Sequence, residues 1–142
     1  LVGSWPATSG QPGSTTSLAD QMAGDFGPIP EGVMYSINPA KIQRWGDLPW
    51  YQKVAAYLPG KHGQWPGGVI AWGHTRVPID IPGGAVVFNT PSGTITRGDF
   101  FIHGGWYPGS AGCIDLGAYE GSFFNYFSAQ TAGMPLTVNY TK

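Results

Sequence analysis

The stretch Phe100-Phe-Ile-His-Gly-Gly-Trp-Tyr-Pro-Gly-Ser-Ala-Gly-Cys-Ile-Asp-Leu116 holds the only cysteine of the chain, ten residues after a histidine. Its apolar start predicts a strand that ends at His103, and the glycines and proline that follow predict a turn-rich loop. Such a loop lets the chain double back. We therefore expect the fold to place Cys113 beside His103.

The composition of the whole chain favours a β-rich fold. Its 142 residues are enough for one domain with a real core, and we expect residues 1–142 to form a single domain. The charged fraction of 11% is less than half the usual value, and 23 glycines and 13 prolines are spread without a period. Short strands joined by Gly/Pro turns explain this composition better than a helical bundle. The predicted fold class is mainly β with about two helices.

Local patterns on either side of the central stretch predict the individual elements. Strands are expected at 1–6, 32–38, 69–73, 77–81, 85–89, 100–103 and 135–140. A helix is expected at 47–58, with Asp47 as N-cap and Pro49 in an early position. A second helix is expected at 117–130, with Phe123, Phe124 and Phe127 facing the core, and one helical turn at 17–23.

Charge and hydropathy exclude two classes of partner. The formal net charge is -1 and there is no basic run, so we expect no nucleic-acid binding. The longest apolar stretches are far short of the roughly 20 residues that span a bilayer, so no membrane insertion is expected. Residues 1–13 lack a basic start followed by an apolar run, so this sequence is not expected to begin with a signal peptide.

Cys113 has two interpretations. Free cysteines are often small, inert core residues. The glycines around Cys113, however, are typical of a tight turn that a substrate can approach closely, and His103 is a base within reach. Since a free thiol is only a few per cent ionised at neutral pH, such a base is needed to make the thiolate. We favour the nucleophile.

Further parts of a reactive site can be named from the same stretch. Backbone N–H groups of Gly112 and Cys113 would form an oxyanion hole in the turn. The group that orients His103 stays open between the carbonyl of Gly104 and the weaker candidates Asp99 and Asp115.

Aromatic residues and a second histidine are expected around the cleft. Trp106 and Tyr107 lie between base and nucleophile, and Trp65 and Trp72 are candidates for the opposite wall. His74 ends a predicted strand and is a candidate polar group beside the cleft. A zinc site made from His62, His74, His103 and Asp80 is not expected, because the close ligand spacing of zinc sites is absent.

The motif residues resemble those of YkuD-type L,D-transpeptidases. His103-Gly104, followed by Ser110-Ala111-Gly112-Cys113-Ile114, is similar to that family's His-Gly, loop, Ser/Thr-His-Gly-Cys, apolar residue and Arg. Three features depart from the pattern: the spacing is short, Ala111 replaces the second histidine, and Asp115 stands where the arginine would be. All three resemble the type VI secretion L,D-transpeptidase effectors, which also share pieces similar to residues 5–13, 27–32 and 101–105.

The resemblance implies a YkuD-like β-sandwich of mixed sheets and a peptidoglycan tetrapeptide stem as substrate. His103 is then the base and Cys113 the nucleophile, with Ser110 and Gly112 shaping the turn and the oxyanion site. Acylation of Cys113 releases the terminal D-Ala; water gives L,D-carboxypeptidase activity, a D-amino acid gives exchange, and a second stem gives a 3→3 crosslink. The resemblance implies no metal or organic cofactor, secretion into the periplasm of a target bacterium, and an immunity protein as partner.

Without the motif arginine, the donor carboxylate of such a substrate needs another cation. Arg97 is nearest to the motif and is our first candidate, ahead of Arg76, Lys61 and Arg44. Asp115 either attracts the diaminopimelate ammonium group or caps the turn.

Three alternatives remain at this stage. A housekeeping L,D-transpeptidase that makes crosslinks in its own cell would carry a signal peptide or anchor upstream. A peptidoglycan-binding or inhibitor module with a spent active site fits the missing arginine and second histidine. Papain-like amidases fit less well, because in many of them the nucleophile precedes its histidine in the chain.

Overall fold

A mixed sheet of five strands runs through the middle of the computed structural model, which describes residues 3–60, 62–106, 110 and 112–140. Its strands, in spatial order, are β1 (Thr8–Ser9), β8 (Ile114–Asp115), β7 (Phe101–His103), β4 (Thr75–Pro78) and β3 (Gln43–Arg44). Neighbours are antiparallel except β7 and β8, which run parallel. Adjacent parallel strands need a connection that returns the chain to the start of the sheet. The chain therefore reverses between His103 and Cys113, as the sequence predicts.

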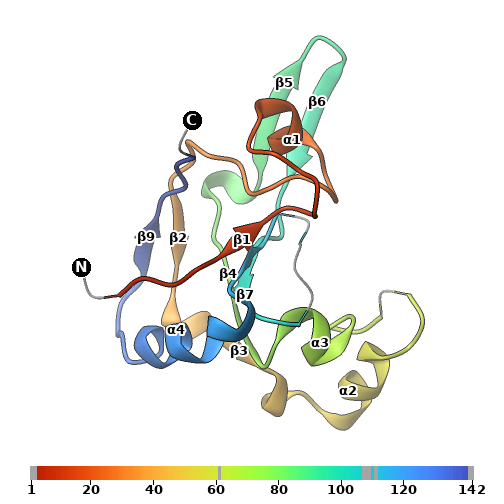
Figure 1. Cartoon of the computed structure of the whole chain (residues 1–142), viewed down its shortest axis with the longest axis vertical. Helices are drawn as coiled ribbons and strands as arrows, with labels where there is room; N and C mark the ends of the chain where they lie inside the picture. Colours follow the sequence, from red (N-terminus) through yellow and green to blue (C-terminus); the bar gives the residue numbers. More distant parts are fainter. Residues whose placement is uncertain (1–2, 61, 107–109, 111, 141–142) are drawn as a thin grey trace.

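Two smaller antiparallel pairs flank this sheet (Figure 1). β2 (Tyr35–Ile37) pairs with β9 (Met134–Leu136), which brings a segment near the end of the chain beside one from its first third. β5 (Val86–Thr90) and β6 (Gly93–Arg97) form a hairpin that projects from the body of the molecule beside α1 (Leu18–Met22).

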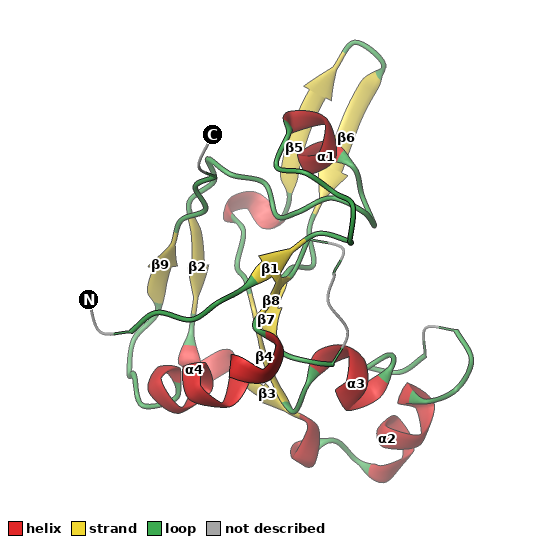
Figure 2. Cartoon of the chain, in the orientation of Figure 1, coloured by secondary structure: helices red, strands yellow, loops and turns green. Residues whose placement is uncertain are grey.

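The described residues contain four α-helices, which is more than the two or so that the composition suggests. Besides α1 they are α2 (Trp50–Ala56), α3 (Gly68–Trp72) and α4 (Glu120–Phe127), drawn in red in Figure 2. Short 3₁₀ turns occur at Pro39–Lys41, Trp45–Asp47, Pro82–Gly84 and Gly117–Tyr119. Within the described part of the chain no helix is long and apolar enough to cross a membrane.

The helix predictions are confirmed in outline. α1 lies within 17–23, α2 within 47–58, and the Gly117–Tyr119 turn leads into α4 within 117–130. Asp47 is not the N-cap of α2; Pro49 holds that position, and Asp47 belongs to the preceding 3₁₀ turn. A proline near the start costs the helix nothing, because the first N–H groups have no partner within the helix.

The prediction of a strand at 69–73 is wrong, because this segment forms α3. Gly67 and Gly68 adopt φ angles of +84° and +63° and turn the chain into the helix, and Gly73, at +72°, ends it. The indole N–H of Trp72 then donates to the Pro66 carbonyl at 2.8 Å. A short apolar run does not distinguish strand from buried helix by its periodicity.

Several strand boundaries also differ from the prediction. β1 begins at Thr8, after the expected 1–6, and residues 3–7 form no strand. β4 begins two residues before the expected 77–81, and β9 covers only the start of 135–140. The sequence patterns do not predict β3, β6 or β8. β5 and β7 lie at their predicted places, within one residue at each end, whereas β2 begins three residues after the expected start of 32–38.

The main core lies on one face of the central sheet. Val77 of β4 and Ile102 of β7 are register partners, and both are buried against Tyr35, Phe100 and the helix α4. Phe124 and Phe127 of α4 are buried as predicted, and Phe123 is partly buried and stacks on Phe127. Because side chains alternate along a strand, the residues next to Val77 and Ile102 point to the opposite face.

The start of the described chain is anchored across this core. Trp5 stacks with Tyr126 and meets the edge of Phe123, and its indole N–H donates to Ser122 Oγ at 2.9 Å. A few residues later β1 pairs with β8. The segment thus connects α4 to β8, the strand that follows Cys113, and Figure 2 shows β1 beside β8.

Candidate active site

Three strands bring ionisable side chains to the sheet face opposite the core. Arg76 on β4 is the register partner of His103 on β7, and His103 is in turn the partner of Asp115 on β8. Paired residues on neighbouring strands point to the same face. Since the adjacent Ile102 faces the core, these three residues share the other face, and all three are buried.

Cys113 reaches the same place from the residue before β8. Its Sγ accepts a hydrogen bond from the backbone N–H of Phe101 at 3.3 Å, and the residue is 6% exposed. Ser110 Oγ donates to the Cys113 carbonyl at 2.7 Å, while the Ser110 N–H donates to the Gly10 carbonyl at 3.1 Å. Ser110 therefore closes the turn before the cysteine.

His103 is held on two sides. Its Nδ1 lies 2.5 Å from the Gly104 carbonyl oxygen, and the Trp72 ring lies 5.0 Å from the imidazole centroid. A carbonyl can only accept, so Nδ1 carries the hydrogen and Nε2 keeps its lone pair. Of the orienting groups considered from sequence, the Gly104 carbonyl is the one that makes this contact.

Burial opposes the charged form of both reactive groups. It raises the pKa of the Cys113 thiol to about 11, although the Phe101 N–H and the Arg76 guanidinium act in the opposite direction. It also lowers the pKa of His103, against the effects of the Gly104 carbonyl and of Asp115 and Glu120. At neutral pH Cys113 is therefore a thiol and His103 a neutral imidazole.

His103 and Cys113 line one pocket of about 530 Å³. Ser110, Trp72 and Asp99 contribute to its walls, together with Ala71 of α3 and the loop residues Gln11, Asp25, Gly60, Pro66, Gly67 and Gly98. The prediction that Trp72 lines the cleft is therefore confirmed. Trp65 does not line the pocket. It is fully buried, and its indole N–H donates to the Gly73 carbonyl.

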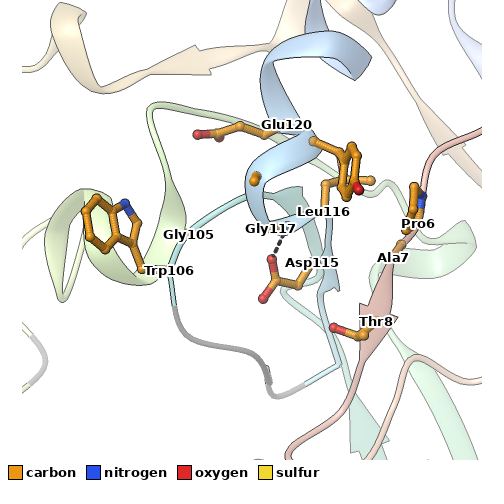
Figure 3. A pocket seen from close by; sticks show the side chains of 11 residues that line it. Pro6, Ala7, Thr8, Gly105, Trp106, Asp115, Leu116, Gly117 and Glu120 are labelled. Atoms are coloured by element: carbon orange, nitrogen blue, oxygen red, sulfur yellow. Dashed lines mark hydrogen bonds between the residues drawn. The ribbon is translucent and has the colours of Figure 1, made fainter.

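Asp115 lines a second pocket of similar size, about 530 Å³, shown in Figure 3. One wall is Trp106, which is 84% exposed, and another is the segment Pro6–Thr8. The Asp115 carboxylate accepts from the Gly117 N–H at 2.8 Å and points into the space between Trp106 and Thr8. The turn-capping role foreseen for Asp115 is therefore present, and its burial raises the pKa of the carboxyl group.

Arg97 does not have the place expected of a substrate-binding cation. It is 4% exposed and lines neither pocket, and its guanidinium donates to the carbonyls of Gln21 at 2.8 Å, Pro28 at 2.5 Å and Gly27 at 3.1 Å. Gly112 packs directly on it: at its φ of +99°, a Cβ would lie 2.5 Å from the Arg97 Nη2. Arg97 thus holds the segment 21–28 against the turn that carries Cys113.

Arg76 is the cation that lies on the site face. Its guanidinium carbon stacks over the rings of Trp65 at 4.1 Å, Trp72 at 4.5 Å and Phe101 at 4.6 Å. Burial lowers its pKa to about 10, so it stays charged at neutral pH. Pairing between β4 and β7 places Arg76 beside His103, but Arg76 is also buried and lines neither pocket, and its guanidinium donates to Gln43 Oε1 at 2.8 Å and to the Gln64 carbonyl at 2.5 Å.

The remaining candidate site residues are either exposed or outside the described part of the chain. His74 is exposed and lines neither pocket, although its backbone contacts Glu120. Arg44 is exposed on β3. Tyr107, Ala111 and Lys61 lie outside the described residues. Among the residues that are described, no group of three or more His, Cys, Asp and Glu side chains is arranged to hold a metal ion.

Glu120 is the site residue that sequence reasoning missed. It begins α4, and its carboxylate accepts from the backbone N–H groups of His74 at 3.1 Å and Thr75 at 3.4 Å. Its charge acts to raise the pKa of His103. An acidic residue in a first helical turn is a common pattern, so nothing in the sequence marked it as part of a site.

Comparison with known proteins gives no match to this chain, whether with family models, curated proteins or solved structures.

Proposed function

We propose that this protein is a cysteine-dependent L,D-carboxypeptidase and exchange transpeptidase of peptidoglycan tetrapeptide stems. The observation that carries the proposal is that His103, which ends β7, and Cys113, which directly precedes the parallel strand β8, line one pocket. A base within reach of a thiol is the signature of a cysteine nucleophile. The choice of substrate rests on the resemblance of residues 103–104 and 110–114 to the L,D-transpeptidase motif.

In the proposed reaction, His103 Nε2 takes the thiol proton as Sγ attacks the carbonyl at the L-centre of diaminopimelate. Backbone N–H groups of Gly112 and Cys113 donate hydrogen bonds to the negatively charged oxygen of the tetrahedral intermediate. When the C–N bond breaks, imidazolium returns the proton to the amine of the departing D-Ala, and a thioester remains. Water or the amine of a D-amino acid then attacks the thioester, His103 takes a proton from the attacking group, and the thiol is restored.

The high thiol pKa is consistent with this order of events. In the buried resting pair, a free thiolate would cost more than a proton transfer concerted with attack. Substrate that fills the pocket brings its carbonyl against the turn N–H groups, which stabilise the charge that develops on oxygen. The neutral imidazole is the form that such a transfer requires.

The second pocket suits the acceptor or the diaminopimelate side chain. Both carry an ammonium group, and the Asp115 carboxylate points into this pocket opposite the exposed ring of Trp106. A carboxylate and an aromatic face are the two groups that favour a cation. Asp115, which replaces the motif arginine, would then bind an ammonium rather than a carboxylate.

The fold and the biological setting are further parts of the proposal. The mixed sheets are compatible with a YkuD-like β-sandwich. The short His–Cys spacing, Ala111 and Asp115 favour the type VI secretion effector branch. A protein of that branch would be secreted, act in the periplasm of a target bacterium and have an immunity protein as partner.

The decisive experiment follows the masses of purified disaccharide-tetrapeptide incubated with the wild type and with Cys113→Ala. Loss of one D-Ala with the wild type alone supports the proposal, and addition of a D-amino acid tests exchange. Appearance of 3→3 dimers would favour the housekeeping transpeptidase. Unchanged tetrapeptide in the presence of folded wild-type protein would rule the activity out.

One observation favours a second candidate, a peptidoglycan-binding module without turnover. The thiol is 6% exposed and its pKa is raised to about 11, as in an inert cysteine. Co-sedimentation with purified cell-wall sacculi separates the two functions: retention of an inactive wild-type protein supports the binding module, whereas turnover excludes it.

A further inference from the structure

The carboxylate of Glu120 rests on two glycines that flank the site. A Cβ at Gly73 would lie 2.2 Å from its Oε2, and a Cβ at Gly104 would lie 2.6 Å from its Cδ. The N–H groups that it accepts from, those of His74 and Thr75, directly follow Gly73. In Figure 3 the side chain leaves the start of α4 and points toward the chain that follows α3.

Gly104 is fixed on every side by this arrangement. Its N–H donates to the Trp72 carbonyl at 3.1 Å, its carbonyl contacts His103 Nδ1, and its Cα lies against the Glu120 carboxylate. The backbone φ of Gly104 is not in the left-handed region, so the backbone itself does not demand glycine there. The carboxylate is what excludes a side chain.

We propose that Glu120 is a positioning residue for His103. By holding the Gly104 peptide, it keeps Nδ1–H on the Gly104 carbonyl and leaves Nε2 to take the proton of Cys113. The consequence for catalysis rests on the proposed function, whereas the effect on the imidazole does not.

Several charged groups act on the pKa of His103, and Glu120 is one of them. Asp115 on β8 and Glu120 on α4 favour the imidazolium, whereas Arg76 on β4 and burial disfavour it. Cys113 is neutral at neutral pH, and the Trp72 ring carries no charge. Removal of the Glu120 charge therefore lowers the pKa of His103, and removal of the side chain also releases the Gly104 peptide.

The test compares Glu120→Gln and Glu120→Ala by long-range ¹H–¹⁵N NMR of the His103 ring in the substrate-free protein. The wild type should show a single Nδ1–H tautomer. Glu120→Gln, which keeps an acceptor oxygen, should keep the tautomer and lower the pKa. Glu120→Ala should give mixed tautomers. Asp47→Asn removes a charge from an exposed carboxylate and should change neither.

Turnover supplies an independent readout. The acid limb of kcat/KM should move to lower pH in Glu120→Gln, because neutral His103 then persists further into acid. Glu120→Ala should lose about tenfold to a hundredfold in kcat/KM, by analogy with residues that orient metal-binding histidines, with partial rescue in Glu120→Gln. A purely structural glutamate would change neither the limb nor the tautomer.

The outcomes separate the two proposals. An unchanged His103 tautomer and pKa in Glu120→Ala overturns the role of Glu120. A changed tautomer without tetrapeptide cleavage by the wild type overturns only the enzymatic proposal. If Glu120→Ala does not fold, Glu120→Gln still decides, since an unchanged His103 pKa in that variant contradicts the inference.

Discussion

At the scale of single residues, burial lowers the pKa of both kinds of basic side chain near Cys113. His103 is kept neutral, because burial lowers its pKa and a carbonyl and carboxylates only partly compensate. Arg97 donates its guanidinium N–H groups to three backbone carbonyls. Both residues should therefore affect the free energy of unfolding.

Acid should destabilise the protein through His103. A group whose pKa is lowered by folding contributes stability above its unfolded value, here 6.5, and loses it as the pH falls toward the lower folded value. Urea unfolding at about pH 7.5 and about pH 5 should show a smaller pH effect in His103→Gln than in the wild type. The exposed His62 provides the control, because His62→Gln should keep the wild-type pH dependence.

Substitution of Arg97 should act on folding before it acts on substrate. Arg97→Ala leaves three buried carbonyls without their donor, at a cost of about 3 kcal/mol or more in the free energy of unfolding. Arg97→Lys should recover only part of this, since an ammonium cannot reproduce the planar fork. Urea midpoints measure the effect, and an unchanged midpoint with weakened turnover would restore Arg97 as a substrate ligand.

At the scale of elements, the turn before β8 depends on a glycine for two reasons. Gly112 has a φ of +99°, and a Cβ there would meet Arg97 and Phe100 at 2.5 Å. The backbone that it shapes supplies the N–H groups of the proposed oxyanion hole. Stability and catalysis therefore depend on the same residue.

Gly112→Ala should lower the free energy of unfolding by more than about 2 kcal/mol, and it should also reduce turnover. Gly13→Ala is the matched control, because Gly13 has a similar φ of +92° and no atom within 4 Å of its Cβ position. Thermal unfolding of the two variants separates backbone strain from collision. Equal shifts of Tm would mean that the contact with Arg97 and Phe100 contributes nothing.

At the scale of the whole molecule, the N-terminal segment links α4 to the strand after Cys113. Trp5 contacts Phe123 and Tyr126, β1 pairs with β8, and the Gly10 carbonyl receives the Ser110 N–H. Residues more than 100 positions apart in sequence are joined in this way, as in the hydrogen bond from Trp5 to Ser122. The segment is therefore part of the fold that supports the site.

Loss of the Trp5 ring should destabilise the protein, whereas loss of an exposed tryptophan should not. Trp5→Ala removes partly buried aromatic contacts and should cost about 2 kcal/mol. Trp50 begins α2 and is 75% exposed, so Trp50→Ala should lower the free energy of unfolding by less than about 0.5 kcal/mol. Denaturant titration followed by circular dichroism measures both; similar losses would contradict the anchoring role of Trp5.

The sequence by itself determined the elements whose signals are local. The apolar run before His103 specified β7, the glycines and proline after it specified the chain reversal, and the phenylalanines of α4 specified its buried face. Cys113 and His103 were identifiable because a lone thiol, a histidine and a glycine turn lie within one short stretch. These signals survive in the structure because they depend on neighbours along the chain.

Only the tertiary structure decided which distant residues join that stretch. Strand pairing brings Arg76 beside His103, and α4 carries Glu120 onto Gly73 and Gly104. Arg97 is closer in sequence, but its guanidinium donates to carbonyls of segment 21–28 and does not line the pocket. Residues 69–72 became a helix because flanking glycines and the Trp72 contacts outweigh a weak β pattern. Register and packing set these choices, and neither is encoded in local spacing.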